Sequence, residues 1–241
     1  MMLQALFSLT FLTVASAFDL KARAVPNRLW MFFLPASMVI LSVRLLLSPD
    51  QLVISLISIA ITTAIAIAIF YLGLYGGADA KALITLAIAH PISTNLFLHF
   101  PFLPLSTFNN SLMLMILTVP FVPVQNFYWK MMRRKSLFQG LEKEPNWKKV
   151  AALLFCIKTE TSKIKPYHIL AEKRIYLNGE AQRTLKIFQK VPEEDVKIDN
   201  TLPDDVFVVF SLPMLPFLTI AYILSIVSGD LILHLLTILL S

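Results

Sequence analysis

Long apolar stretches, nearly free of charged side chains, alternate with short polar connections along this chain. Crossing the hydrocarbon core of a membrane takes about 20 helical residues, and six stretches come close to that length. They cover residues 1–18, 29–47, 52–74, 80–100, 112–129 and 206–227. The pattern predicts an α-helical integral membrane protein with about six transmembrane helices.

A polar insert separates the last apolar stretch from the other five. Its short apolar runs alternate with turn residues, and Asn178-Gly179 between two β-prone runs predicts a hairpin. Val191-Pro192 predicts a further turn. We therefore expect three parts: residues 1–129 with five transmembrane helices and the candidate site, residues 130–205 as a small α+β soluble insert, and residues 206–241 with the sixth helix and a tail.

Composition excludes an ordinary soluble protein, because 57% of the residues are hydrophobic and only 15% are charged, against about 25% charged in soluble domains. The net charge of +6 is explained by basic cytoplasmic loops. Basic and aromatic residues do not alternate as they would in a nucleic-acid-binding protein, so we expect no nucleic acid partner.

A single cysteine, Cys156, excludes an intramolecular disulfide and a multi-cysteine metal site. Four scattered histidines, at positions 90, 99, 168 and 234, lack metal-ligand spacing, so we expect no metal or cofactor.

The connections predict which side of the membrane each loop occupies. Of the 21 Lys and Arg residues, 16 lie between Lys130 and Lys197. Placing the basic connections in the cytoplasm puts the insert there and the N-terminus outside. Arg44 is the one exception, and we expect it to snorkel to the outer surface. An alternative is that residues 1–17 form a cleavable signal peptide, although they lack the usual basic start.

Asp19 and Asp79 are the strongest functional candidates. A charged group at the bilayer centre costs about 2.5–3.5 kcal/mol on insertion scales, so carboxylates near membrane depth indicate function. Asp19 ends the first stretch and Asp79 begins the fourth. Two complete crossings separate them, so the chain returns to the same face. Gly76 and Gly77 precede Asp79 and allow a peptide backbone to approach closely.

Two neighbouring carboxylates can divide acid and base roles, because both cannot easily ionise together. Helix dipoles favour the anion at a helix N-terminus and the acid at a C-terminus. We therefore expect Asp79 to act as the base and Asp19 as the acid. The alternative is purely structural, with Asp19 capping the loop and Asp79 acting as a helix N-cap. Lys81 lies two positions from Asp79, on another helix face, and serves as a cytoplasmic anchor or orients substrate.

These residues resemble motifs of the prepilin and preflagellin peptidases, a family of membrane aspartic proteases. Residues 19–27 (DLKARAVPN) are similar to the family's aspartate, basic loop and Pro-Asn step, and residues 76–81 (GGADAK) to its Gly-x-Gly-Asp motif and lysine. Ala78 replaces the second glycine. Residues 212–217 (LPMLPF) and 228–230 (SGD) resemble the end of the archaeal branch. Without the cysteine-rich motif of the bacterial branch, we expect neither zinc nor methylation.

The resemblance implies an aspartic endopeptidase that removes short basic leaders from preflagellin-like or prepilin-like precursors at the cytoplasmic face, with Asp19 and Asp79 catalytic and Gly76, Gly77 and Lys81 in the motif. Two alternatives remain open. One is an intramembrane protease of the presenilin and signal-peptide-peptidase type, against which the basic loop and Pro26-Asn27 argue. The other is a transporter that uses the two carboxylates as ion ligands.

Overall fold

The computed structural model describes residues 2–73, 75–93, 100–164, 168–177, 180–186, 203–209 and 212–240. The chain divides into two compact units, residues 1–116 with 213–241 and residues 117–212. The regular elements described in the first unit are all helices: α1 (Met2–Ala22), α2 (Asn27–Leu47), η1 (Pro49–Gln51), α3 (Leu52–Tyr71), α4 (Gly77–Ala89), α5 (Leu103–Thr118), α8 (Met214–Ser228) and α9 (Leu231–Leu240).

Among the described residues, four helical stretches are long and apolar enough to cross a membrane, and the pair α8 and α9, bent by 52°, adds a fifth if it counts as one span. The four are Met2–Ala22, Asn27–Leu47, Pro49–Tyr71 and Leu103–Arg133. This confirms the prediction of a helical membrane protein with a small strand-containing region before the C-terminal helices. The part of the chain that the structure describes thus contains four or five candidate spans, whereas the sequence predicts about six.

Three predicted stretches have different limits in the structure. The fourth ends early, because α4 stops at Ala89 before Pro91, and a proline disfavours helix in the residue that precedes it. The fifth is longer than expected and consists of α5 and α6 (Phe121–Arg133), separated near Pro120. The sixth does not begin at Val206. Residues Asp205–Val209 form strand β5, because this run is rich in β-branched valine as well as apolar.

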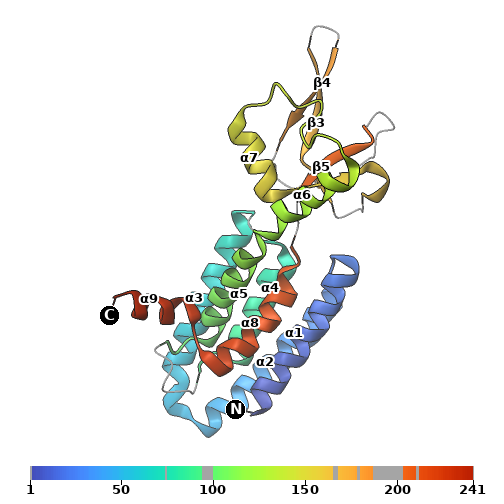
Figure 1. Cartoon of the computed structure of the whole chain (residues 1–241). Helices are drawn as coiled ribbons and strands as arrows, with labels where there is room; N and C mark the ends of the chain where they lie inside the picture. The colour runs from blue at the N-terminus through green and yellow to red at the C-terminus, as the bar shows by residue number, and fades with distance from the viewer. Residues whose placement is uncertain are drawn as a thin grey trace. The chain divides into compact units, whose positions relative to one another are not determined.

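The core of the helical unit lies between α1, α4 and α8, with α2 and α3 against α4. Figure 1 shows α1 in blue beside α8 in red, although they come from opposite ends of the chain. The side chains of Ser16 and Thr219 join these two helices by a hydrogen bond of 2.7 Å. Hydrogen bonds between small polar side chains are a common means of holding membrane helices together. The end of α1 is thereby fixed against the start of α8.

Arg44 is buried, whereas its position in the sequence predicts a side chain that snorkels to the outer surface. Only 9% of the residue is exposed, and its guanidinium donates to the side-chain oxygens of Gln4 and Gln51. The Gln4 amide in turn donates to the carbonyl of Ala89, at 2.9 Å. Arg44 therefore joins three helices through neutral amides, an arrangement that its position in the sequence does not reveal.

The second unit is the strand-containing insert. It comprises α6, α7 (Asn146–Phe155), β1 (Cys156–Glu160), η2 (Thr161–Lys163), β2 (Ile169–Leu170), β3 (Glu172–Leu177), β4 (Glu180–Leu185) and β5. One antiparallel sheet has the order β1-β5-β2, with Cys156 opposite Val209, and β3 pairs with β4 with Leu177 opposite Glu180. The predicted turn residues Asn178-Gly179 and Val191-Pro192 lie outside the described residues.

Candidate active site

Asp19 lies one turn before the end of α1, where the helix packs against α8. The backbone of Leu215, in the first turn of α8, forms a hydrogen bond with its carboxyl group. The positive charge of Arg23 also acts on this carboxyl. Its other oxygen, Oδ2, is buried and has no hydrogen-bond partner among the described residues. This oxygen therefore has hydrogen-bonding capacity that no described residue uses.

Asp79 is the third residue of α4, and its Oδ2 accepts a hydrogen bond of 3.1 Å from the backbone N–H of Gly76. This is the reciprocal half of a capping box, in which the third helical residue satisfies the N–H of the N-cap. The purely structural alternative from the sequence makes Asp79 the N-cap of its helix. Asp79 does take part in capping α4, but the N-cap position itself is occupied by Gly76.

A side chain at position 76 would crowd the carboxylate of Asp79. A Cβ built on Gly76 would lie 3.3 Å from Oδ2 of Asp79 and would press on that oxygen. A Cβ on Gly77 would lie 3.5 Å from the ring of Phe70, an ordinary contact. Gly73, at the end of α3, has a φ of 70°, a conformation that glycine adopts without cost. Glycine is thus favoured by the backbone at position 73 and by the space beside Asp79 at position 76.

The fold brings Asp19 and Asp79 within electrostatic reach of each other, because the charge of Asp19 acts on the carboxyl group of Asp79. The two residues lie on different helices, α1 and α4, which pack together. Tyr75 also lies within the field of Asp79, and its ring packs edge-on against Phe108 of α5, with centroids 6.0 Å apart. The sequence-predicted pair is thus brought together, next to an aromatic residue that sequence reasoning missed.

Lys81 binds Asn27. Its Nζ donates a hydrogen bond of 2.7 Å to Oδ1 of Asn27, the first residue of α2. The contact joins the two sequence motifs directly, because Lys81 follows Asp79 on α4 and Asn27 ends the loop that follows Asp19. Lys81 forms this bond and not one with Asp79, in agreement with the prediction that Lys81 and Asp79 lie on different faces of the helix. Asn27 belongs to the Pro-Asn step of the first motif. That step is the sequence signal that points to Asn27 as a residue of the site.

Other polar residues of the helical unit have structural partners. The ring nitrogen Nδ1 of His90 lies 2.8 Å from the hydroxyl of Tyr222. Asp230 accepts a hydrogen bond from Asn109 at 2.7 Å and caps the start of α9 through two backbone N–H groups. Within the described parts of the chain, no three His, Cys, Asp or Glu side chains gather as a metal site would require.

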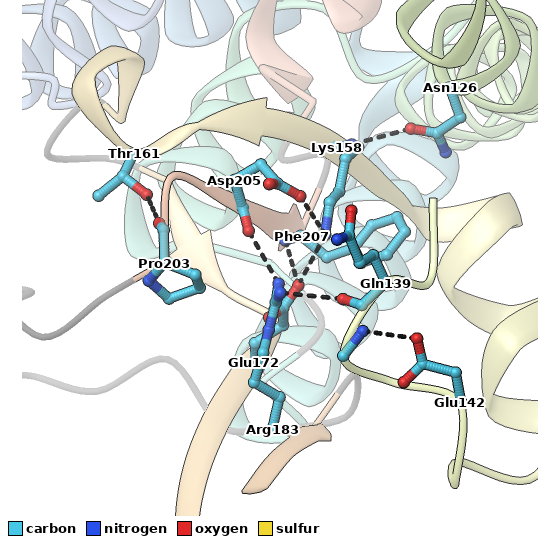
Figure 2. Close-up of polar contacts among 11 residues, drawn as sticks. Asn126, Gln139, Glu142, Lys158, Thr161, Glu172, Arg183, Pro203, Asp205 and Phe207 are labelled. Carbon is cyan, nitrogen blue, oxygen red and sulfur yellow. Dashed lines mark hydrogen bonds and ion pairs between the residues drawn. The ribbon is translucent and has the colours of Figure 1, made fainter. Parts of the chain in front are cut away.

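The insert has an ion cluster of its own, centred on the fully buried Lys158 (Figure 2). Its Nζ lies 3.0 Å from Asp205 and 3.4 Å from Glu172. Arg183 donates two hydrogen bonds to Oε2 of Glu172, at 2.9 and 2.7 Å, and the backbone N–H of Phe207 donates to Oε1 at 2.7 Å. Two cations face two carboxylates, so the charges of this cluster balance and it serves to hold β1, β3, β4 and β5 together.

Cys156 lies at the start of β1 and is completely buried. Burial, together with the nearby negative charge of Glu172, raises the pKa of its thiol to about 12. A thiol needs its thiolate form to act as a nucleophile. Cys156 is therefore a packing residue.

The fold and the site define a class, namely a polytopic membrane protein whose helices hold two interacting carboxyl groups beside a glycine-containing turn. Residues 6–119 match the model of the type IV leader peptidase family, and the matched region contains both aspartates. The match supports an aspartic-type leader peptidase. It also implies pilin-like precursors as the general class of substrate. No curated protein matches the chain.

Proposed function

We propose that this chain is an aspartic leader peptidase and that Asp19 and Asp79 are its catalytic pair. The observation that carries the proposal is the electrostatic interaction of their carboxyl groups across two packed helices. Two carboxyl groups that share one proton provide a base and an acid at the same time. This is the arrangement that hydrolysis of a peptide bond requires when no metal or nucleophilic side chain takes part.

Asp79 acts as the base in this proposal. Burial and the charge of Asp19 raise the pKa of Asp79 to about 6, whereas the N–H of Gly76 and the N-terminus of α4 favour its charged form, so this carboxyl group is mostly ionised at neutral pH. It takes a proton from water as the water oxygen bonds to the peptide carbonyl carbon. Asp19 gives its proton to the carbonyl oxygen, and its unpartnered Oδ2 is suited to carry that proton. The proton on Asp79 then passes to the leaving nitrogen, a hydroxyl proton of the intermediate returns to Asp19, and the C–N bond breaks.

The finer substrate class in this proposal is a preflagellin-like or prepilin-like precursor with a short basic leader, cut at the cytoplasmic face. Two of the nearby cations that would repel such a leader have internal partners. Lys81 donates to Asn27, and the charge of Arg23 acts on Asp19. The basic connections of the chain support the cytoplasmic placement through the positive-inside rule.

The test uses the full chain in lipid nanodiscs with a purified pilin-like precursor, and follows leader removal on a gel. Asp19→Asn and Asp79→Asn should each reduce cleavage by at least a thousandfold. Asp50→Asn, at an exposed aspartate of η1, is the matched control and should cleave normally. Full activity in either of the first two variants would refute the catalytic pair. Cleavage inside the hydrophobic helix of the precursor, and not after its leader, would favour an intramembrane protease.

A further inference from the structure

Helix α7 presents its apolar side outward. Its exposed large side chains are Trp147, Val150, Leu154 and Phe155, which are 62%, 55%, 38% and 45% exposed. At 100° per residue these positions fall on one side of the helix. On the opposite side, Ala152 is completely buried. A helix on the surface of a soluble domain normally has the reverse arrangement, with its apolar stripe toward the core.

The rest of α7 is held firmly in the insert. The helix packs against α6 and β1. Lys149 donates a hydrogen bond of 2.8 Å to the carbonyl of Glu142, and Lys148 forms an ion pair of 2.9 Å with Glu144. The outward orientation of the apolar side is therefore fixed by contacts on the inner and lateral sides, and the four exposed side chains form a preorganised surface.

The neighbouring helix α6 also exposes apolar side chains. Its buried side rests on β1, where Asn126 accepts a hydrogen bond from the N–H of Lys158 and donates to the carbonyl of Cys156. Its other sides carry large exposed residues between 61% and 68% exposed: Phe121, Val124, Phe127, Tyr128, Met131 and Met132. Large exposed apolar surfaces are normally covered by a lipid membrane or by another protein.

We propose that the outward side of α7 is a membrane-surface anchor that inserts into the anionic headgroup layer of the bilayer the chain spans. Connectivity supports this occupant, because α6 closes the candidate span Leu103–Arg133 and α8 follows the insert. Charge supports it too: residues 130–149 contain seven Lys or Arg residues and two Glu residues. Basic segments near the membrane are attracted to anionic lipids, and amphipathic helices bury their apolar side at the interface.

The test places an environment-sensitive nitrobenzoxadiazole dye on Val150→Cys in the full chain, in nanodiscs with or without phosphatidylglycerol. Lys163→Cys is the matched control in the same unit, since its side chain is 67% exposed. The native Cys156 is buried, and the unmutated chain should take up no dye. Leu154→Cys repeats the measurement at a second position of the same side. The readouts are quenching by spin-labelled lipid and by iodide in the water.

At positions 150 and 154, we expect lipid quenching at least threefold stronger than at position 163, and iodide quenching at least threefold weaker. Lipid quenching should fall when phosphatidylglycerol is replaced by zwitterionic lipid. Iodide quenching equal to that of the control would overturn the proposal. Protection from both quenchers would overturn it as well, because a second copy or another protein surface would then cover α7. The measurement needs no peptidase activity, so its outcome is independent of the proposed catalytic pair.

Discussion

The bond between Lys81 and Asn27 should position Asp79 relative to Asp19. Lys81 follows Asp79 on α4, and Asn27 begins α2 after the loop that leaves Asp19. At 2.7 Å the contact is a well-formed hydrogen bond from a cation to an amide oxygen. Because it joins the two motifs and not the protein to a substrate, its loss should change the rate of cleavage and leave precursor binding nearly intact.

The expected magnitude follows from the strength of one exposed hydrogen bond. Such a bond contributes about 0.5–1.5 kcal/mol net, and 1 kcal/mol corresponds to about a fivefold change in rate. Lys81→Met and Asn27→Ala should therefore each lower kcat by about fivefold, with KM nearly unchanged. The double variant should lose no more than either single one, because both substitutions remove the same bond.

The assay is steady-state cleavage of a purified precursor in nanodiscs by the four chains of this double-mutant cycle. Lys21→Met is the matched control, because it removes one exposed positive charge near Asp19 and leaves the Lys81–Asn27 bond intact. It should keep kcat within twofold. If the two single losses multiplied in the double variant, the residues would act independently. If KM rose with kcat unchanged, Lys81 would contact the substrate.

Three further predictions concern single side chains. Gly76→Ala should reduce cleavage at least tenfold, because its Cβ would press on the carboxylate of Asp79, whereas Gly77→Ala should stay within threefold; the gel assay of leader removal compares them. Lys158→Met should destabilise the insert by about 3–5 kcal/mol, since removing one partner leaves buried carboxylates uncompensated; faster amide hydrogen exchange in β1 and β5 would register the loss, and unchanged exchange would contradict it. Cys156 should resist maleimide at pH 8 until denaturant is added, because it is buried and the pKa of its thiol is about 12; rapid labelling of the folded chain would contradict this.

Asp19 and Asp79 could be identified from the sequence because the reactive groups are carboxylate side chains, which the residue type reveals directly. A carboxylate beside an apolar stretch is conspicuous, and counting two crossings places Asp19 and Asp79 on one face without any coordinates. The structure contains both intervening helices among its candidate spans. The contribution of Leu215 could not be found in this way. Its backbone N–H reaches Asp19 only because α8 packs on α1, and a backbone group leaves no mark in the sequence.

The limits of the apolar stretches were harder to predict for a different physical reason. Residues 206–209 are apolar and mostly valine, so they satisfy the criteria for a membrane segment and for a buried strand equally well. Pairing with β1 and β2 decides between them, and those partners come from distant parts of the insert. Arg44 shows the same dependence on distant partners, because only the folded arrangement of Gln4 and Gln51 allows its burial.

Ala78 departs from the family's glycine, and the backbone at this position accommodates alanine. The residue is the second of α4, and its φ is not positive, since Arg23 and Arg134 are the non-glycine residues with positive φ in the described chain. Alanine is the strongest helix former, and Ala78 packs against the core. The position where a side chain would crowd the carboxylate is Gly76, which this chain keeps. Glycine thus leaves space in this turn where the backbone N–H meets Asp79, and position 78 contributes the helix that holds it.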